Sequence, residues 1–189
     1  MTHVSVGNLV IGNDQPLTII AGPCQLETED HAQMIAGRMK EACDAVGAQY
    51  VFKASYDKAN RTSLSGIRGM GIDAGLKALQ SVGRSIGVPV LTDVHNEAQC
   101  AIAAEAVDIL QIPAFLCRQT DLLVAAGSTG KPVNVKQGQV LAPEDMESAA
   151  RKVEAGSQGK GGGVFFTERG STFGYLYLVV DFQAMARMK

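Results

Sequence analysis

Short apolar segments alternate with longer amphipathic segments along most of this chain. The apolar segments predict six buried strands, at residues 17–21, 49–53, 88–92, 107–111, 132–135 and 164–167. The segments between them carry apolar residues at helical spacing and predict helices at about 27–46, 71–86, 97–106, 118–126 and 143–155. Strands that alternate with helices in this way are typical of β-α-β units built on a parallel sheet.

The two ends of the chain depart from this alternation. Residues 4–6 and 9–11 predict the strands of a short antiparallel hairpin, with Gly7 and Asn8 in its tight turn. From about Leu178 onward we expect a helix, although its first residues include β-branched ones.

A glycine-rich stretch at residues 156–163 could be taken for a phosphate-binding loop. A P-loop requires Ser or Thr after Gly-Lys, whereas Gly161 follows Lys160 here. The stretch also precedes a predicted strand instead of following one, which would place it at the end of a barrel away from the chemistry. We therefore interpret it as a plain connection between a helix and a strand.

The chain has 189 residues, a length that suits one domain. A (β/α)8 barrel needs about 250 residues, or about 31 for each unit. The predicted strands recur at roughly that interval, so the chain has room for about six barrel units. No linker divides residues 1–189 into separate domains.

Composition narrows the class of protein. Lys and Arg number 17 against 19 Asp and Glu, and this net charge of −2 argues against a basic surface for nucleic acid. Charged residues make up only 19% and glycines number 21, which favours a compact fold with many turns over a disordered segment. No apolar run approaches the roughly 18 residues of a transmembrane helix. The chain does not start like a signal peptide and its four cysteines form no CxxC pair, so we expect a soluble protein of the reducing cytoplasm.

Cations gather where the predicted strands end. Lys53, Lys58 and Arg61 follow the second strand, Lys136 follows the fifth, and Arg169 follows the sixth. The carboxyl ends of parallel strands share one edge of a sheet, so these side chains would face one mouth. Like charges repel unless anions lie between them, so the expected ligand carries several negative charges. The alternative is that each cation is a solvated loop charge.

Two further side chains at strand ends could take part in chemistry. Cys24 follows Gly-Pro after the first strand, where its sulfur could be a thiolate metal ligand or a nucleophile, or could pack as a small apolar group. His95 follows the third strand and could bind a ligand or transfer protons. The remaining histidines and cysteines are expected to be bystanders or packing residues: His3, His31, Cys43, Cys100 and Cys117.

Six strings at the strand ends carry a family resemblance. They are IAGPC at 20–24, FKASYDKANR at 52–61, LTDVH at 91–95, LQIPAFLCRQTD at 110–121, VNVK at 133–136 and ERG at 168–170. Together they resemble the 3-deoxy-D-manno-octulosonate 8-phosphate synthases, over a stretch from Ile19 to Asp181. The resemblance implies an α/β fold of the (β/α)8 TIM-barrel type with an N-terminal hairpin, usually as a homotetramer. About six of the eight units would fall within the single domain 1–189.

The resemblance also implies a reaction and roles for individual residues. The family condenses phosphoenolpyruvate with arabinose 5-phosphate and releases phosphate, a step in the synthesis of a lipopolysaccharide sugar. Phosphoenolpyruvate would be held by Lys53, Lys58, Lys136 and Arg169, in a pocket lined by Gln111, Ala114 and Phe115. Arabinose 5-phosphate would be bound by Asn60, Arg61 and Thr62, in part from a neighbouring subunit, and Ser55 would also contact substrate. Asp93 and His95 would shape the centre of the site. The resemblance thus implies five candidate catalytic residues: Lys53, Lys58, Asp93, His95 and Lys136.

Cys24 resembles the metal-dependent branch of the family, in which Cys follows Gly-Pro, whereas the metal-independent branch carries Asn. This implies a divalent ion, of a kind the sequence does not specify, that orients water or the aldehyde. In that branch the other ligands are a His, a Glu and an Asp from strands seven and eight and their loops. None of them falls within this sequence, whose last residue is Lys189. Because one thiolate is not a metal site, we expect a chain truncated at its C-terminus and much less active than a full-length version.

Two alternatives stay open. The chain could be a catalytically silent remnant that still binds phosphorylated ligands or a partner subunit. It could also be the related synthase that uses erythrose 4-phosphate, although the string from Lys53 to Arg61 favours the octulosonate enzyme.

Overall fold

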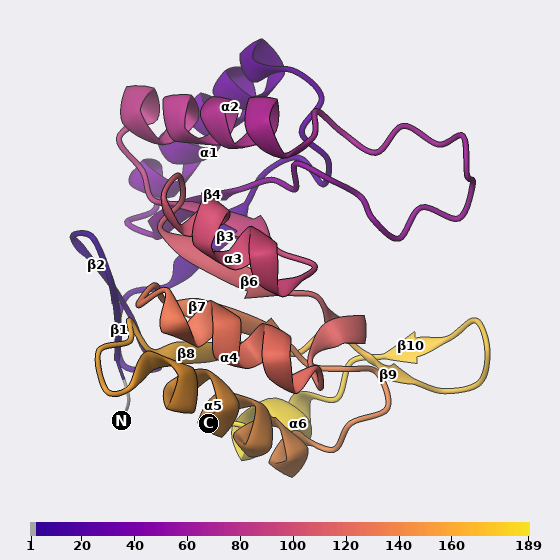
Figure 1. Ribbon diagram of the computed structural model, residues 1–189. Coiled ribbons are helices and arrows are strands. Elements are labelled where there is room, and N and C mark those ends of the chain that lie inside the picture. Colours follow the sequence, from indigo (N-terminus) through magenta and orange to yellow (C-terminus); the bar gives the residue numbers. More distant parts are fainter. Residues whose placement is uncertain (1–2) are drawn as a thin grey trace.

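A parallel sheet of six strands forms the centre of the molecule (Figure 1). The computed structural model describes residues 3–189. The strands lie side by side in chain order: β3 (Thr18–Ala21), β4 (Gln49–Lys53), β5 (Val90–Asp93), β6 (Ile109–Ile112), β7 (Val133–Lys136) and β8 (Val164–Thr167). All six predicted strands are confirmed, with ends that differ from the prediction by at most two residues. The sheet curls into part of a barrel, and β3 and β8 are its edges among the described residues.

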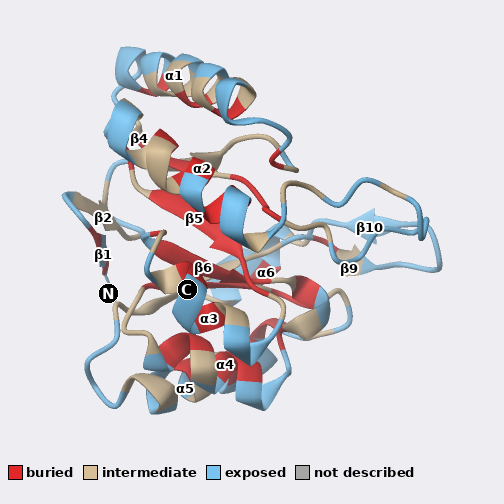
Figure 2. Cartoon of the chain, turned by 45° about the horizontal axis from the view of Figure 1, so that its top comes forward, coloured by how far each residue is buried: buried red, intermediate tan, exposed pale blue. Residues whose placement is uncertain are grey.

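Helices pack on the outer face of this sheet and turn their buried side toward it (Figure 2). They are α1 (Glu29–Ala45), α2 (Ile72–Ile86), α3 (Glu97–Ala104), α4 (Thr120–Ser128) and α5 (Met146–Ser157). Local chemistry sets their ends: the Thr28 hydroxyl accepts a hydrogen bond from the backbone N–H of His31 at the start of α1, and Asn96 caps α3 in the same way. No helix within residues 3–189 is both long and apolar enough to cross a membrane.

Two predicted helices begin later than expected, and a short 3-10 turn precedes each of them. The turn η1 (Ala114–Leu116) precedes α4, and η2 (Pro143–Asp145) precedes α5. Pro113 and Pro143 suit these turns, since proline has no backbone N–H to donate.

The prediction of a helix from about Leu178 is wrong for its first residues. After β8 the chain forms an antiparallel pair, β9 (Ser171–Thr172) and β10 (Leu178–Val179), in which Leu178 pairs with Thr172. The β-branched pair Val179-Val180 suits an extended chain better than a helix. Helix α6 (Phe182–Arg187) begins only after Asp181, whose carboxylate accepts from the backbone N–H of Gln183.

The predicted N-terminal hairpin is confirmed, and it closes one end of the curled sheet. It consists of β1 (Val4–Val6) and β2 (Leu9–Ile11), and lies at the end opposite to the long 57–71 loop (Figure 1). Val4 and Val6 pack with Val51, Leu91 and Ile109 in a core cluster inside the sheet, separate from the larger core beneath the helices. The other end of the sheet, where the strands run out, therefore remains open to a ligand.

Helices α4 and α5 approach each other closely because glycine lies at their contact. A Cβ atom at Gly156 would lie 2.1 Å from the backbone oxygen of Val124, and one at Gly127 would lie 1.9 Å from that of Val153. Backbone atoms cannot move aside as a flexible side chain can, so the helices would have to separate.

We predict that Gly156→Ala lowers the free energy of unfolding by about 2 kcal/mol, the usual cost of forcing extra volume into a packed contact. Gly37→Ala is the matched control, because its Cβ would meet only the Ile86 side chain at 3.9 Å in mid-helix α1. That control should raise stability by up to about 1 kcal/mol through helix propensity. Denaturant titration of the two variants measures both values, and equal effects would contradict the packing argument.

Candidate functional site

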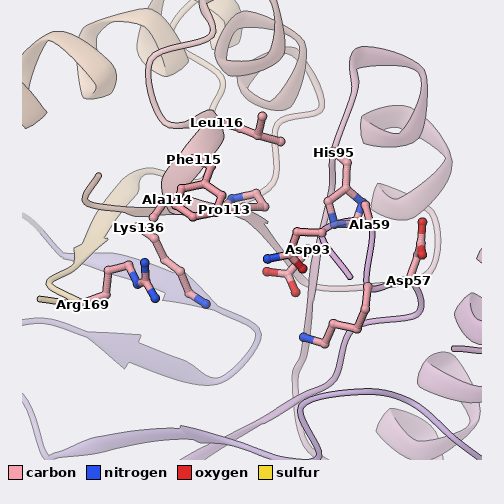
Figure 3. Close-up of a pocket in the computed structure, with 12 residues that line it drawn as sticks. Asp57, Ala59, Asp93, His95, Pro113, Ala114, Phe115, Leu116, Lys136 and Arg169 are labelled. Carbon is pink, nitrogen blue, oxygen red and sulfur yellow. The ribbon is translucent and has the colours of Figure 1, made fainter. Parts of the chain in front are cut away.

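The carboxyl ends of the strands open into a pocket of about 430 Å³ (Figure 3). Eight of the predicted site residues line it: Lys58, Asn60, Asp93, His95, Ala114, Phe115, Lys136 and Arg169. Four others were not predicted, namely Asp57, Ala59, Pro113 and Leu116. Each of these lies beside a predicted residue in one of the strings at the strand ends, and that adjacency was the only sequence signal for them.

The Asp93 carboxylate, at the end of β5, lies in the wall of this pocket. Asp93 is only 7% exposed, and it accepts hydrogen bonds from the Ser55 hydroxyl and the Gln111 side-chain amide. The Nζ of Lys53 lies 3.5 Å from Asp93 Oδ2. Side chains from the two neighbouring strands, β4 (with its exit) and β6, therefore converge on the carboxylate that β5 carries.

Opposing influences act on the pKa of Asp93. Burial favours the neutral acid and by itself would raise the pKa. Attraction to Lys53 and the hydrogen bonds from Ser55 and Gln111 outweigh burial, so the pKa lies below its ordinary value and Asp93 is a carboxylate at neutral pH.

Ser55 connects two lysines to this carboxylate. Its hydroxyl oxygen accepts hydrogen bonds from Lys53 Nζ at 3.0 Å and from Lys58 Nζ at 3.1 Å while it donates to Asp93. Ser55 is buried and its position is fixed by the chain after β3, because Leu26 N donates to Ser55 O at 2.9 Å. Both ammonium groups are thus oriented before any ligand binds.

Lys136 and Arg169 reach the pocket from the ends of β7 and β8, on the side opposite to His95 (Figure 3). Burial lowers the pKa of Lys136, and repulsion from Lys53, Lys58 and Arg169 lowers it further against the attraction of Asp93. A bound anion would relieve this repulsion, because it would place negative charge among the cations. The arrangement is therefore suited to a ligand with several negative charges.

His95 presents an uncommitted imidazole to the pocket. Its Nδ1 is buried and has no hydrogen-bond partner among the described residues. The ring of Tyr56 meets the imidazole edge to face, with centroids 6.3 Å apart, and the backbone N–H of His95 donates to the Gln99 side chain at 2.8 Å. The imidazole is therefore held in place at the wall of the pocket.

Arg61 and Thr62 do not join the pocket. Both are exposed on the loop between β4 and α2, where the Arg61 guanidinium donates to the Gln25 side chain and to the backbone oxygen of Ile67. Cys43, Cys100 and Cys117 are buried in the main core, as predicted, and neither His3 nor His31 lines the pocket. The glycine-rich stretch 156–163 joins α5 to β8, also as predicted.

Cys24 lies beside the pocket, at the exit of β3. Its thiol is exposed, and the nearby Lys58 ammonium lowers the pKa of the thiol despite partial desolvation. A thiolate of this kind suits a soft divalent ion. However, no group of three or more His, Cys, Asp or Glu side chains within residues 3–189 could hold a metal ion. The described residues therefore supply one donor and do not form a metal site by themselves.

Comparisons with known proteins show the family of this chain. Residues 1–189 match the model of the DAHP synthetase I family. The chain is 57% identical to a 2-dehydro-3-deoxyphosphooctonate aldolase of Chelativorans sp. (strain BNC1), over 98% of this chain and 66% of that protein. Proteins of the same name from Cyanothece sp. (strain PCC 7425 / ATCC 29141) and Bartonella henselae are each 52% identical over 96% of this chain, covering 66% and 64% of their own lengths. The resemblance read from the strand ends is confirmed, and the chain spans about two thirds of the length of these relatives.

The low pKa of Asp93 predicts how stability changes with pH. A carboxyl group whose pKa falls on folding stabilises the protein above its unfolded pKa of about 3.9, and this contribution is lost as the pH drops through the folded value. Asp93→Asn should therefore be less stable than the parent at pH 7, on the order of 3 kcal/mol. The difference should shrink below about pH 4.

Denaturant unfolding of both proteins between pH 3 and pH 7 tests this expectation. Asp44→Asn is the control, because Asp44 forms only an exposed i,i+4 pair with Lys40 on α1. A constant difference between parent and Asp93→Asn across the whole range would contradict the proposed charge state.

Proposed function

Because the chain belongs to the DAHP synthetase I family, we propose that it provides the phosphoenolpyruvate pocket of a synthase. The reaction condenses phosphoenolpyruvate with arabinose 5-phosphate to give 3-deoxy-D-manno-octulosonate 8-phosphate and phosphate, in the synthesis of a lipopolysaccharide sugar. The names of the relatives support this sugar over erythrose 4-phosphate. We also propose that the enzyme acts in the cytoplasm.

One observation carries the proposal. Four cations surround one pocket and one buried carboxylate, and they come from the ends of three different strands: Lys53, Lys58, Lys136 and Arg169. Phosphoenolpyruvate carries two anionic groups, a carboxylate and a phosphate ester, on the same carbon atom, C2. Arginine can hold either group through two parallel hydrogen bonds, and the lysines supply compact positive charges.

In the proposed reaction C3 of phosphoenolpyruvate bonds to the aldehyde carbon of the sugar, and the aldehyde oxygen takes up a proton. Water adds at C2, and the bond from C2 to the phosphate oxygen then breaks to leave a ketone and inorganic phosphate. Lys136 and Arg169 would stabilise the charge that develops on the leaving phosphate. His95, whose imidazole lines the pocket, is the group that would hold or move a proton at this centre.

Asp93 would not need to move a proton in this scheme. Its carboxylate is engaged by Ser55, Gln111 and Lys53, so its role is to orient the lysine that meets the substrate. Asn60, in the pocket, and Arg61 and Thr62, on the exposed loop, are assigned to the sugar phosphate. We assign part of that contact to a neighbouring subunit of a homotetramer, since Arg61 lies outside the pocket of its own chain.

We assign Cys24 to a divalent metal ion, which would orient a water or the aldehyde as a Lewis acid. The exposed thiol and the proximity of Lys58 support the assignment, because they favour the thiolate that a metal binds. The remaining ligands are not supplied by residues 3–189. The steps above therefore use only side chains of this chain.

The second candidate is a chain that binds phosphorylated ligands without turning them over. The observation in its favour is that this chain spans 64–66% of the three relatives, with β3 and β8 as open edges of its sheet.

We predict that the 189-residue chain releases phosphate from the two substrates far more slowly than a version extended to the length of its relatives. The physical reason is that the pocket is present while the metal ligands are incomplete. Phosphate release, measured with both substrates and with or without added divalent metal, distinguishes the two candidates. Robust metal-stimulated turnover by this chain would overturn the expectation, and binding without turnover would favour the second candidate.

Binding alone can be tested by calorimetry with phosphoenolpyruvate. Loss of a charge-assisted hydrogen bond costs about 1.5–3 kcal/mol, so Lys136→Met should weaken binding by about 10- to 150-fold. Lys77→Met is the matched control, because Lys77 is exposed on α2 and does not line the pocket. Equal affinity in both variants would show that Lys136 does not contact the ligand.

A further inference from the structure

The loop between β4 and α2 is closed at its base like an Ω-loop. The backbone N–H of Lys58 donates to the oxygen of Arg68 at 2.7 Å, and the N–H of Gly71 donates to the oxygen of Tyr56 at 3.1 Å. From Lys58 to Arg68 the chain extends into solvent as a long loop (Figure 1). Residues 58–68 therefore leave the sheet and return to nearly the same point.

A two-pronged ion pair joins the same two ends. Arg68 Nε lies 2.8 Å from Asp57 Oδ1, and Arg68 Nη2 lies 2.5 Å from Asp57 Oδ2. The Asp57 side chain is 19% exposed and that of Arg68 is 56% exposed. A bidentate pair of this geometry restricts orientation more than an ordinary surface ion pair does.

Glycine makes this closure possible. Gly69 has φ +123, a conformation that other residues rarely adopt, and a Cβ there would lie 2.5 Å from the backbone oxygen of Tyr56. The segment that returns at Gly69 thus contacts the segment that leaves at Tyr56, directly beside the ion pair.

The ion pair also determines what the pocket presents to an anion. Asp57 is a carboxylate in the lining of a pocket that is otherwise rich in cations, and it lies across the pocket from Lys136 and Arg169 (Figure 3). Both of its oxygens are occupied by Arg68. It is therefore held away from Lys58, the adjacent cation, which is left to face Ser55 and the pocket.

We propose that Asp57 and Arg68 form a clamp that positions the substrate loop, so that Lys58, Asn60 and Arg61 are presented in one arrangement. Neither residue of the clamp needs to touch the reacting atoms. The expected effect on ligand binding rests on the proposed function. The clamp itself does not, because it is a property of the loop alone.

Limited trypsin digestion tests the clamp without any ligand. Trypsin cuts after Lys58, Arg61 and Arg68, and Asp57→Asn keeps all three sites. We expect cleavage after Arg61 to be about three- to tenfold faster in Asp57→Asn, with little change in the thermal unfolding midpoint. Arg68→Gln should have the same effect at Arg61, and the double variant should be no faster than either single one, because a pair is lost only once.

Ligand affinity distinguishes loss of the clamp from a simple change of charge, because the two predict opposite changes in affinity. Asp57→Asn removes a negative charge from the lining of an anion pocket, so simple electrostatics predicts tighter binding of a phosphorylated ligand. Loss of the clamp predicts weaker binding, by about three- to tenfold for arabinose 5-phosphate and less for phosphoenolpyruvate. Titration calorimetry of the parent and both single variants separates these outcomes.

Glu147→Gln is the matched control for both measurements, because it breaks an exposed ion pair with Arg151 on α5, far from the loop. Unchanged cleavage after Arg61 in Asp57→Asn, or additive effects in the double variant, would overturn the clamp. If the parent binds neither ligand, the proposed function fails and the cleavage rates still decide whether the clamp exists.

Discussion

The buried carboxylate of Asp93 is the interaction on which the site depends. Cations that arrive from neighbouring strands at one edge of a sheet repel one another, and burial increases that repulsion because less water screens it. Asp93 places a fixed negative charge among them, and the hydrogen bonds from Ser55 and Gln111 hold that charge in the ionised form. Lys53 and Lys58 can therefore be ordered at the base of the pocket before a ligand arrives.

One carboxylate does not neutralise the whole group. Lys136 remains in an environment that lowers its pKa, with Arg169 beside it and no ion-pair partner of its own within 4.0 Å among the described residues. The remaining positive charge is what a doubly anionic substrate would neutralise. Asp57 does not reduce it, because Arg68 engages both of its oxygens. The two carboxylates of the site thus have different roles. Asp93 orders the lysines, whereas Asp57 is held away from them by Arg68.

The scaffold directs ligands to this edge by closing the other. Val4 and Val6 of the N-terminal hairpin fill the inside of the curled sheet against Val51, Leu91 and Ile109, and Gln49 pins the hairpin through hydrogen bonds to both backbone groups of Val10. The helices cover the outer face, with α4 and α5 in contact through glycine. The carboxyl edge is then the surface at which polar groups of several strands meet one pocket, as in other parallel α/β folds.

Much of the architecture followed from the pattern of residues alone. Apolar runs located every strand of the sheet and the N-terminal hairpin, because strand burial and helix periodicity are local properties of a sequence. The strings at the strand ends identified the cations and the family, and the prediction that they face one mouth followed from the parallel topology. The segment after Asp181 was placed correctly as a helix, whereas the residues just before it formed a strand instead.

What the sequence determined by itself was which residues are available at the mouth and the sign of the charge they carry. Only the tertiary structure decided which partner each charged group has. The pattern gave no sign that Ser55 links two lysines to Asp93, that Arg61 turns away to Gln25, or that Arg68 engages Asp57 from eleven residues along the chain. Hydrogen bonds and ion pairs depend on distances of a few ångströms between particular atoms, whether their residues are near or far in sequence. Those distances exist only after the strands, the loop and the helices have packed together.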